Sequence, residues 1–96
     1  MKISLIKRDK IKEQIISVLF NHSPLALFTA DVASEIARDE EFVKIILQEM
    51  KEQGFINLIN MNQNGTLYRR RMRWILNSQT YESYKKIHNI KNTENV

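Results

Sequence analysis

The chain has 96 residues, of which 43% are hydrophobic and 27% are charged, and its formal net charge is +4. This length supports one domain with one modest core, and the lack of cysteine excludes a disulfide scaffold, thiolate zinc sites and a cysteine nucleophile. No apolar run approaches the roughly 20 residues that span a bilayer, and two glycines with one proline leave little room for a many-turned β protein, so we expect a mainly helical chain without a membrane span.

A first helix is predicted from Lys7 to Phe20, because one stripe of this stretch is apolar and the opposite side is charged. The apolar stripe comprises Ile11, Ile15, Val18 and Leu19. The opposite side carries Lys10, Lys12 and Glu13. The sequence before this helix lacks the continuous apolar segment and the small-residue cleavage site of a signal peptide, so a cytoplasmic location is expected.

Turn-forming residues from Asn21 to Pro24 end the first helix. The short apolar run Leu25–Phe28 that follows fits a brief strand. Thr29 is expected to cap a second helix, Ala30–Arg38. About one residue separates this helix from the next, so the two helices must meet at a sharp angle.

The third helix, Asp39–Gln53, has the clearest amphipathic pattern in the chain, and its apolar residues predict a buried stripe. These residues are Val43, Ile46, Leu47 and Met50. Asp39 is a good N-cap, and Glu40 and Glu41 fall in the first turn, where the helix dipole favours negative charge. Gly54 follows directly and can take the left-handed conformation that ends a helix.

After the third helix the apolar period changes from 3.6 to 2, which indicates strands. Asn64-Gly65 is a strong signal for a type I′ turn between two of them. Taking these two residues as the loop pairs Phe55 with Trp74 and Ile56 with Arg73. The face with Phe55 and Trp74 is then predicted to pack on the helices. The other face collects Arg69, Arg71 and Arg73 in one line.

A fourth helix is predicted for residues 77–90, with Ser78 as a candidate cap, followed by a frayed polar tail at 91–96. Residues 1–76 then form the main domain. This domain has little core left to cover an apolar stripe on the fourth helix, so we interpret the stripe as a homodimer contact, with packing within the chain as the alternative. The predicted dimer residues are Tyr81, Tyr84 and Ile87.

The net charge hides an asymmetry along the chain. Residues 1–28 carry a net charge of +3, residues 29–54 carry −4, and residues 55–96 carry +5. A basic protein suggests nucleic acid or another polyanion as partner. Here the basic charge lies on either side of the second and third helices and not within them.

The order helix, short strand, helix, helix, hairpin, helix resembles that of the winged helix-turn-helix superfamily. The run ADVASEIARDEEFVKIILQEMKEQGFI carries the resemblance, with an A-x-x-A/S-E-I/L segment in the second helix and E-Q-G-F-I before the wing. The resemblance covers residues 8–76 and implies a mainly α fold with a small antiparallel β-hairpin wing. It also implies a DNA-binding transcriptional regulator, commonly a homodimer with its third helix in the major groove, although a minority of the superfamily binds only protein.

The start of the third helix departs from the superfamily pattern. Where its members usually carry Ser, Thr, Arg, Gln or Asn, this chain carries Asp39, Glu40 and Glu41. Carboxylates repel phosphates, and among the usual base contacts they suit only the cytosine amino group. Either these residues cap the helix, or they belong to a surface that binds a basic protein.

The arginine-rich second strand of the wing is the strongest functional signal. Arginine suits phosphate contact and insertion into a narrow minor groove, and the amides at the wing tip suit phosphates or base edges. The alternative is a solvated strand face with ordinary turn chemistry. The DNA-binding residues predicted for the wing are Arg69, Arg70, Arg71, Arg73, Asn62 and Asn64.

On the third helix, Lys44, Gln48 and Lys51 are predicted to reach DNA, with a solvated face as the alternative. Ile45 lies near the same face and has three interpretations: packing on the first helix, contact with a thymine methyl group, or a protein-binding surface. A basic cluster on the first helix is either a further phosphate contact or a solvated helix end. This cluster comprises Lys7, Arg8, Lys10 and Lys12.

His22 and His88 lack metal-ligand spacing, and no Gly-rich phosphate loop or nucleophile elbow is present, so no enzyme, cofactor, metal or small-molecule substrate is predicted. We predict a homodimeric transcriptional regulator bound to double-stranded DNA. The alternatives are a winged-helix protein–protein interaction module with an acidic third helix, and a non-specific nucleic-acid binder. The predicted core is Ile15, Leu19, Val32, Ile36, Val43, Ile46, Leu47, Met50, Phe55 and Trp74.

Overall fold

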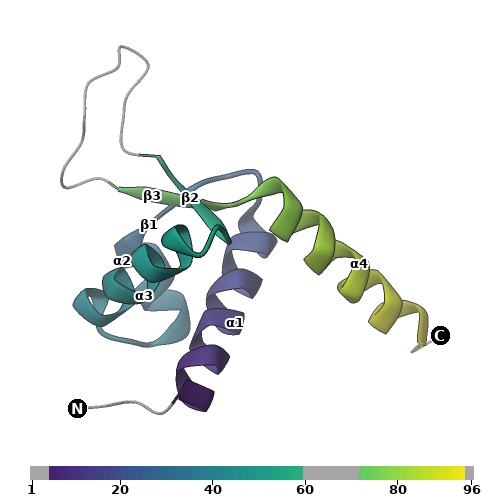
Figure 1. Cartoon of the computed structure of the whole chain (residues 1–96), viewed down its shortest axis with the longest axis horizontal. Helices are drawn as coiled ribbons and strands as arrows, with labels where there is room; N and C mark the ends of the chain where they lie inside the picture. The colour runs from purple at the N-terminus through teal and green to yellow at the C-terminus, as the bar shows by residue number, and fades with distance from the viewer. Residues whose placement is uncertain (1–4, 60–71, 95–96) are drawn as a thin grey trace.

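The structure, a computed structural model, describes residues 5–59 and 72–94. Within these residues, four helices and three strands follow in the order α1, β1, α2, α3, β2, β3, α4 (Figure 1). The strands form one antiparallel sheet in the order β1-β3-β2, so the last strand in the chain is the middle one. The predicted class, mainly α with a small antiparallel sheet, is confirmed.

The first three helices pack beside one another, with α1 (Leu5–His22) upright in Figure 1 and α2 (Thr29–Ile36) packed against both α1 and α3 (Glu40–Glu52). The predicted start of α3 is confirmed, because Asp39 Oδ2 accepts a hydrogen bond from the Phe42 amide at 3.0 Å. Its end is confirmed too, since Gly54 has a φ of +85°. Helix α2 ends earlier than predicted, because Ala37 takes the left-handed conformation.

One hydrophobic core joins these three helices to the sheet. Its buried residues are Ile11, Ile15, Leu19, Leu27, Val32, Ala33, Val43, Ile46, Leu47, Met50, Ile56, Trp74 and Leu76. The core prediction is wrong for Phe55, which is 42% exposed, and Ile36 is only half-buried. The other predicted core residues are buried, so the inward faces of α1, α2 and α3 are the predicted ones.

Thr29 does not cap α2 as predicted. The extended residue before the helix is Phe28, and Thr29 is only 8% exposed. Its Oγ1 accepts a hydrogen bond of 2.8 Å from Trp74 Nε1. A buried donor that loses its acceptor costs about 1–3 kcal/mol, so this bond fixes the start of α2 to β3.

The strands β2 (Ile56–Ile59) and β3 (Arg73–Leu76) pair with Ile56 opposite Leu76. The predicted partner of Ile56 was Arg73, three positions away. An odd shift in register turns a strand over, which is why Ile56 is buried and Phe55 is exposed. A regular hairpin with a two-residue loop at Asn64-Gly65 would give different residue pairs from those observed. The Asn64-Gly65 segment itself lies outside the described residues.

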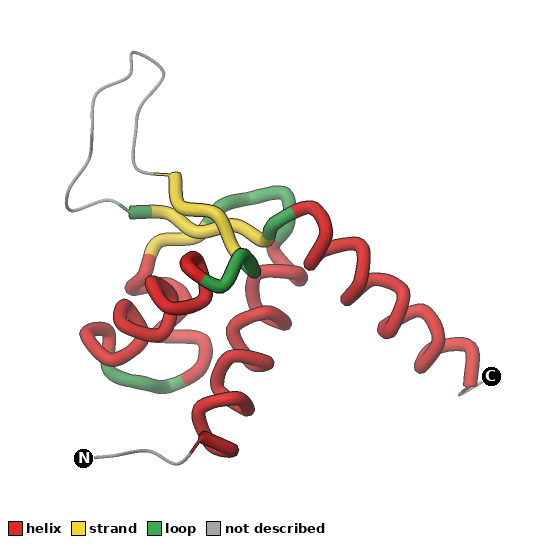
Figure 2. The backbone as a smooth tube through the Cα atoms, viewed as in Figure 1, coloured by secondary structure: helices red, strands yellow, loops and turns green. Residues whose placement is uncertain are grey.

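The outer elements are short or projecting. Strand β1 (Leu27–Phe28) pairs with the other edge of β3 and confirms the predicted brief strand. Helix α4 (Ser78–Glu94) leads away from the other helices (Figure 2) and runs beyond the predicted end at residue 90. Asn77 and not Ser78 caps it, because Asn77 Oδ1 accepts a hydrogen bond of 2.9 Å from the Gln79 amide.

Candidate nucleic-acid interface

Four exposed side chains form a strip along the side of α3 that faces away from the core. At about 100° per residue, these positions lie opposite the buried stripe of the helix. We call them the outer strip: Glu41, Ile45, Gln48 and Glu52. Ile45 is 56% exposed, which is incompatible with the interpretation that it packs on α1.

Lys44 and Lys51 lie along one flank of the outer strip, two helical turns apart. Lys44 is half-buried and Lys51 is exposed. Neither ammonium group forms an ion pair with any residue in the described ranges. Both charges are therefore available to an anion that approaches the outer strip.

The opposite flank holds an ion-pair cluster between α1 and α3. Arg8 Nε and Nη2 donate to Glu49 Oε2 at 3.0 Å and 2.7 Å, and Lys12 Nζ donates to Glu49 Oε1 at 3.2 Å. Hydrogen bonds from Arg8 and then Lys12 lower the pKa of Glu49 below its ordinary value of 4.5. Lys12 also donates to Gln53 Oε1 at 3.2 Å. Arg8 and Lys12, two members of the predicted basic cluster, are thus paired with side chains of α3 or its C-terminal end. Lys12 therefore does not lie on a solvated side of α1.

The first turn of α3 is acidic and exposed. Asp39 serves as the cap, which confirms the capping interpretation for that residue. Glu40 and Glu41 are exposed next to it. Phosphates that approach α3 therefore meet carboxylates at its start and lysines further along.

Arg73 is the predicted DNA-binding residue of the wing that lies in the described part of the chain. It lies on β3 between Phe28 of β1 and Ile59 of β2, on the sheet face opposite Trp74, and it forms no ion pair with a described residue. The remaining predicted wing residues lie outside the described residues. They are Arg69, Arg70, Arg71, Asn62 and Asn64.

Arg38 is a cation that the sequence interpretation did not include. It is exposed in the turn between α2 and α3, and within the described ranges its guanidinium forms no ion pair. Its position in the sequence could have indicated it, because a cation between the second and third helices lies next to the start of the third helix. The left-handed Ala37 before it sets the direction in which the chain enters α3.

The aromatic stripe of α4 packs partly on α1. The Phe20 ring centroid lies 5.1 Å from that of Tyr81, 4.8 Å from that of Tyr84 and 5.8 Å from that of His88. Both tyrosines are half-buried as a result. Ile87, the third member of the predicted dimer contact, is 54% exposed.

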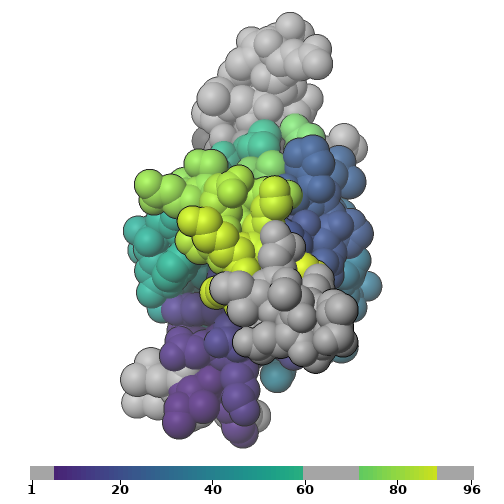
Figure 3. All heavy atoms as spheres, turned by 90° about the vertical axis from the view of Figure 1, so that its right-hand side faces the viewer, coloured from purple at the N-terminus to yellow at the C-terminus, as the bar shows by residue number. Residues whose placement is uncertain are grey.

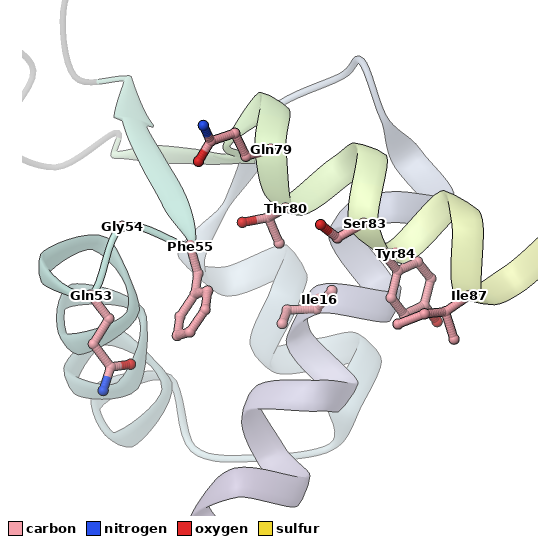
Figure 4. Close-up of a pocket in the computed structure, with 9 residues that line it drawn as sticks. All are labelled: Ile16, Gln53, Gly54, Phe55, Gln79, Thr80, Ser83, Tyr84 and Ile87. Atoms are coloured by element: carbon pink, nitrogen blue, oxygen red, sulfur yellow. The ribbon is translucent and has the colours of Figure 1, made fainter.

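A pocket of about 420 Å³ lies where α1, the end of α3 and α4 meet (Figure 4). Its lining residues are Ile16, Gln53, Gly54, Phe55, Gln79, Thr80, Ser83, Tyr84 and Ile87. Figure 3 looks onto this side of the molecule and shows α4 facing the viewer, in green to yellow. Phe55, which was predicted to lie in the core, therefore lines this pocket instead.

Within residues 5–59 and 72–94, no helix is long and apolar enough to cross a membrane. The same residues contain no group of three or more side chains that could hold a metal ion.

No protein-family model and no curated protein matches the chain. Among solved structures, a ZitR mutant from Lactococcus lactis is similar with a TM-score of 0.60 and 18% identity, over 85% of this chain and 55% of the ZitR chain. The MepR–DNA complex from S. aureus is similar with a TM-score of 0.67 and 20% identity, over 95% of this chain and 75% of MepR. A MepR mutant from an S. aureus clinical isolate has a TM-score of 0.58 and 20% identity, over 79% of this chain and 59% of that chain. In the ZitR comparison the chain spans little more than half of the matched protein. The likeness establishes the fold, which is a winged helix-turn-helix.

Proposed function

We propose that this chain is a DNA-binding transcriptional regulator that binds a specific duplex sequence as a homodimer. The observation that carries the proposal is the outer strip of α3, which is exposed beside Lys44 and Lys51, two lysines that form no ion pair with a described residue. The fold supports it, because MepR, a structure of similar fold, is solved in complex with DNA. In this proposal α3 lies at the major groove and the wing lies along the backbone or minor groove.

The charges favour the wing as the main phosphate contact. Residues 55–96 carry a net charge of +5, whereas the first turn of α3 is acidic. Arginine on the wing therefore supplies affinity, and α3 contributes from Lys44 onward. Each phosphate that the protein neutralises releases counterions and steepens the dependence of log affinity on log salt by roughly 0.9.

The test begins with selection of a bound duplex from a random-sequence library, followed by anisotropy titrations at several salt concentrations. Replacing Arg69 and Arg71 by Ala should weaken binding to selected and random duplexes alike and flatten the salt slope by about 2 per protomer. The matched control replaces Lys85 and Lys86 on α4 by Ala, which removes the same charge outside the proposed DNA contact. Absence of binding to any duplex at low salt contradicts the proposal.

The homodimer in this proposal forms through α4. Support comes from the way α4 leads away from the core, with the apolar Ile87 exposed on it. The half-exposed Phe55 lies in the adjoining pocket, so apolar surface continues from α4 onto the domain. Burial of this apolar surface favours self-association.

A protein-binding module is the second candidate, favoured by the exposed carboxylates of α2 and the start of α3. These are Asp31, Glu40 and Glu41, together with Glu35, whose Oε1 lies 2.7 Å from His22 Nε2. Replacing Glu40 and Glu41 by Gln distinguishes the two. If α3 faces DNA, the change removes repulsion and strengthens binding to random duplex DNA. If α3 binds a basic protein, DNA binding is unchanged. Equal binding to every duplex would instead indicate a non-specific nucleic-acid binder.

A further inference from the structure

We infer that the outer strip of α3 reads adenine and thymine in the major groove, with Ile45 against a thymine methyl group and Gln48 hydrogen-bonded to an adenine. The inference rests on the proposed function and adds the class of base that this helix recognises. It depends on the two side chains at the centre of the strip. Both are exposed, and neither has a partner in the described part of the chain.

The chemistry of the two side chains matches one pair of bases. The thymine C5-methyl is the apolar group that base edges present in the major groove, and an aliphatic side chain suits it. A glutamine amide can both accept from adenine N6 and donate to adenine N7. Ile45 and Gln48 therefore supply an apolar contact and a bidentate amide side by side.

Their spacing fits neighbouring bases. The two residues are three positions apart on α3, which is about 4.5 Å along the helix axis. Successive bases along one strand rise by about 3.4 Å. The two side chains thus address the same base pair or two adjacent ones.

The composition of the strip also disfavours guanine. Arginine or lysine to guanine O6 and N7 is the commonest specific contact in the major groove. The outer strip has neither, since Glu41 and Glu52 occupy its two ends and Lys44 and Lys51 lie on its flank. In this arrangement the lysines on the flank lie toward the phosphates that border the groove. The carboxylates at the ends suit the amino group of cytosine and not guanine O6 and N7, so a G·C pair at either end of the strip would be read through its cytosine.

Single-atom changes in DNA test the inference. The probe is the duplex that wild-type protein selects from a random library, with each thymine replaced in turn by deoxyuridine and each adenine by 7-deazaadenine. At one thymine, loss of the methyl should weaken wild-type binding about fourfold, which corresponds to ~0.8 kcal/mol for one buried carbon. At the same or an adjacent pair, loss of adenine N7 should weaken binding about threefold or more.

The variants assign each effect to its side chain. Ile45→Ala should bind the deoxyuridine and thymine duplexes equally, and Gln48→Ala should bind the 7-deazaadenine and adenine duplexes equally. Both positions are exposed and alanine favours helix, so circular dichroism should show an intact fold. Leu25→Ala, which removes an exposed aliphatic side chain outside α3, should keep both sensitivities.

Two results overturn the inference in different ways. If a duplex is selected but no thymine methyl affects binding, or Ile45→Ala keeps the methyl sensitivity, the inference is wrong and the proposed function stands. If wild-type protein selects no duplex, the proposed function and the inference fail together.

Discussion

Helices α3 and α4 are held in place in different ways. Four side chains of α3 are fully buried, and an ion-pair cluster joins it to α1. The described side chains of α4 meet the rest of the molecule through rings packed on Phe20 and through Tyr81, which also packs against the core. The core therefore fixes where α3 presents its outer strip, whereas the direction of α4 depends on a few contacts made between residues 81 and 88.

The largest effect that tests this comparison is on the free energy of unfolding. Leu47 of α3 is 0% exposed, so Leu47→Ala should cost about 2–5 kcal/mol. Ile87→Ala in α4 should cost less than about 0.5 kcal/mol in the monomer, because that side chain is exposed. Urea unfolding at a concentration where both variants are monomeric measures the difference. Similar losses for the two variants would mean that α4 is anchored as firmly as α3.

A second variant loosens the contact between α4 and α1. Phe20→Leu keeps an apolar side chain on α1 but removes the ring that contacts Tyr81, Tyr84 and His88. We expect a loss of about 1–2 kcal/mol, since an aromatic pair contributes roughly 0.5–1.5 kcal/mol beyond area burial and contacts that share one ring are not additive. Hydrogen exchange should accelerate in α4 and stay unchanged in α3. Equal acceleration in both helices would contradict the separate anchoring of α4.

The third variant concerns self-association through the exposed part of α4. Ile87→Glu places a charge in the proposed dimer contact and should weaken dimerisation at least tenfold, which corresponds to about 1.4 kcal/mol. Sedimentation equilibrium measures the change, and Ile87→Val serves as the conservative control. This position is a cleaner choice than Tyr84, whose ring also packs on Phe20. A wild-type protein that stays monomeric at high micromolar concentration removes the α4 dimer.

The smallest effect concerns the charges that join α1 to α3. Because Arg8 and Lys12 lower the pKa of Glu49, this pairing stabilises the fold at neutral pH and is lost as the pH falls below 4.5 through the folded-state pKa. Glu49→Gln should cost about 0.2–1 kcal/mol at pH 7, as partly exposed ion pairs do. The difference from wild type should shrink toward pH 3. A constant difference across this range would show that charge does not contribute.

Local pattern was enough to predict the helices, and distance along the chain explains most of the errors. The inward face of α3 follows from its own residues, and Asp39 caps it through a contact three residues away. Thr29 was misread because its partner, Trp74, is 45 residues distant. The ion pair between Arg8 and Glu49 spans 41 residues and was missed for the same reason.

The predictions for the candidate site also divide into local ones that hold and long-range ones that fail. Gln48 and Lys51 are exposed as their helical positions predicted, whereas Lys44 lies on the flank of the outer strip and is half-buried. The face of β2 was wrong because its register was taken from a turn signal, and one odd shift reverses every side chain on a strand. The wing residues beyond Arg73 remain a prediction.

The place of β3 in the middle of the sheet has a consequence for a chain that leaves the ribosome from its N-terminus. Strand β1 is complete at residue 28, yet its only strand partner in the described sheet is β3, which ends at residue 76. Until that segment emerges, Thr29 lacks the Trp74 indole and the three helices lack the largest side chain of their core. Translation must therefore pass the whole wing before the first helices can reach their native packing.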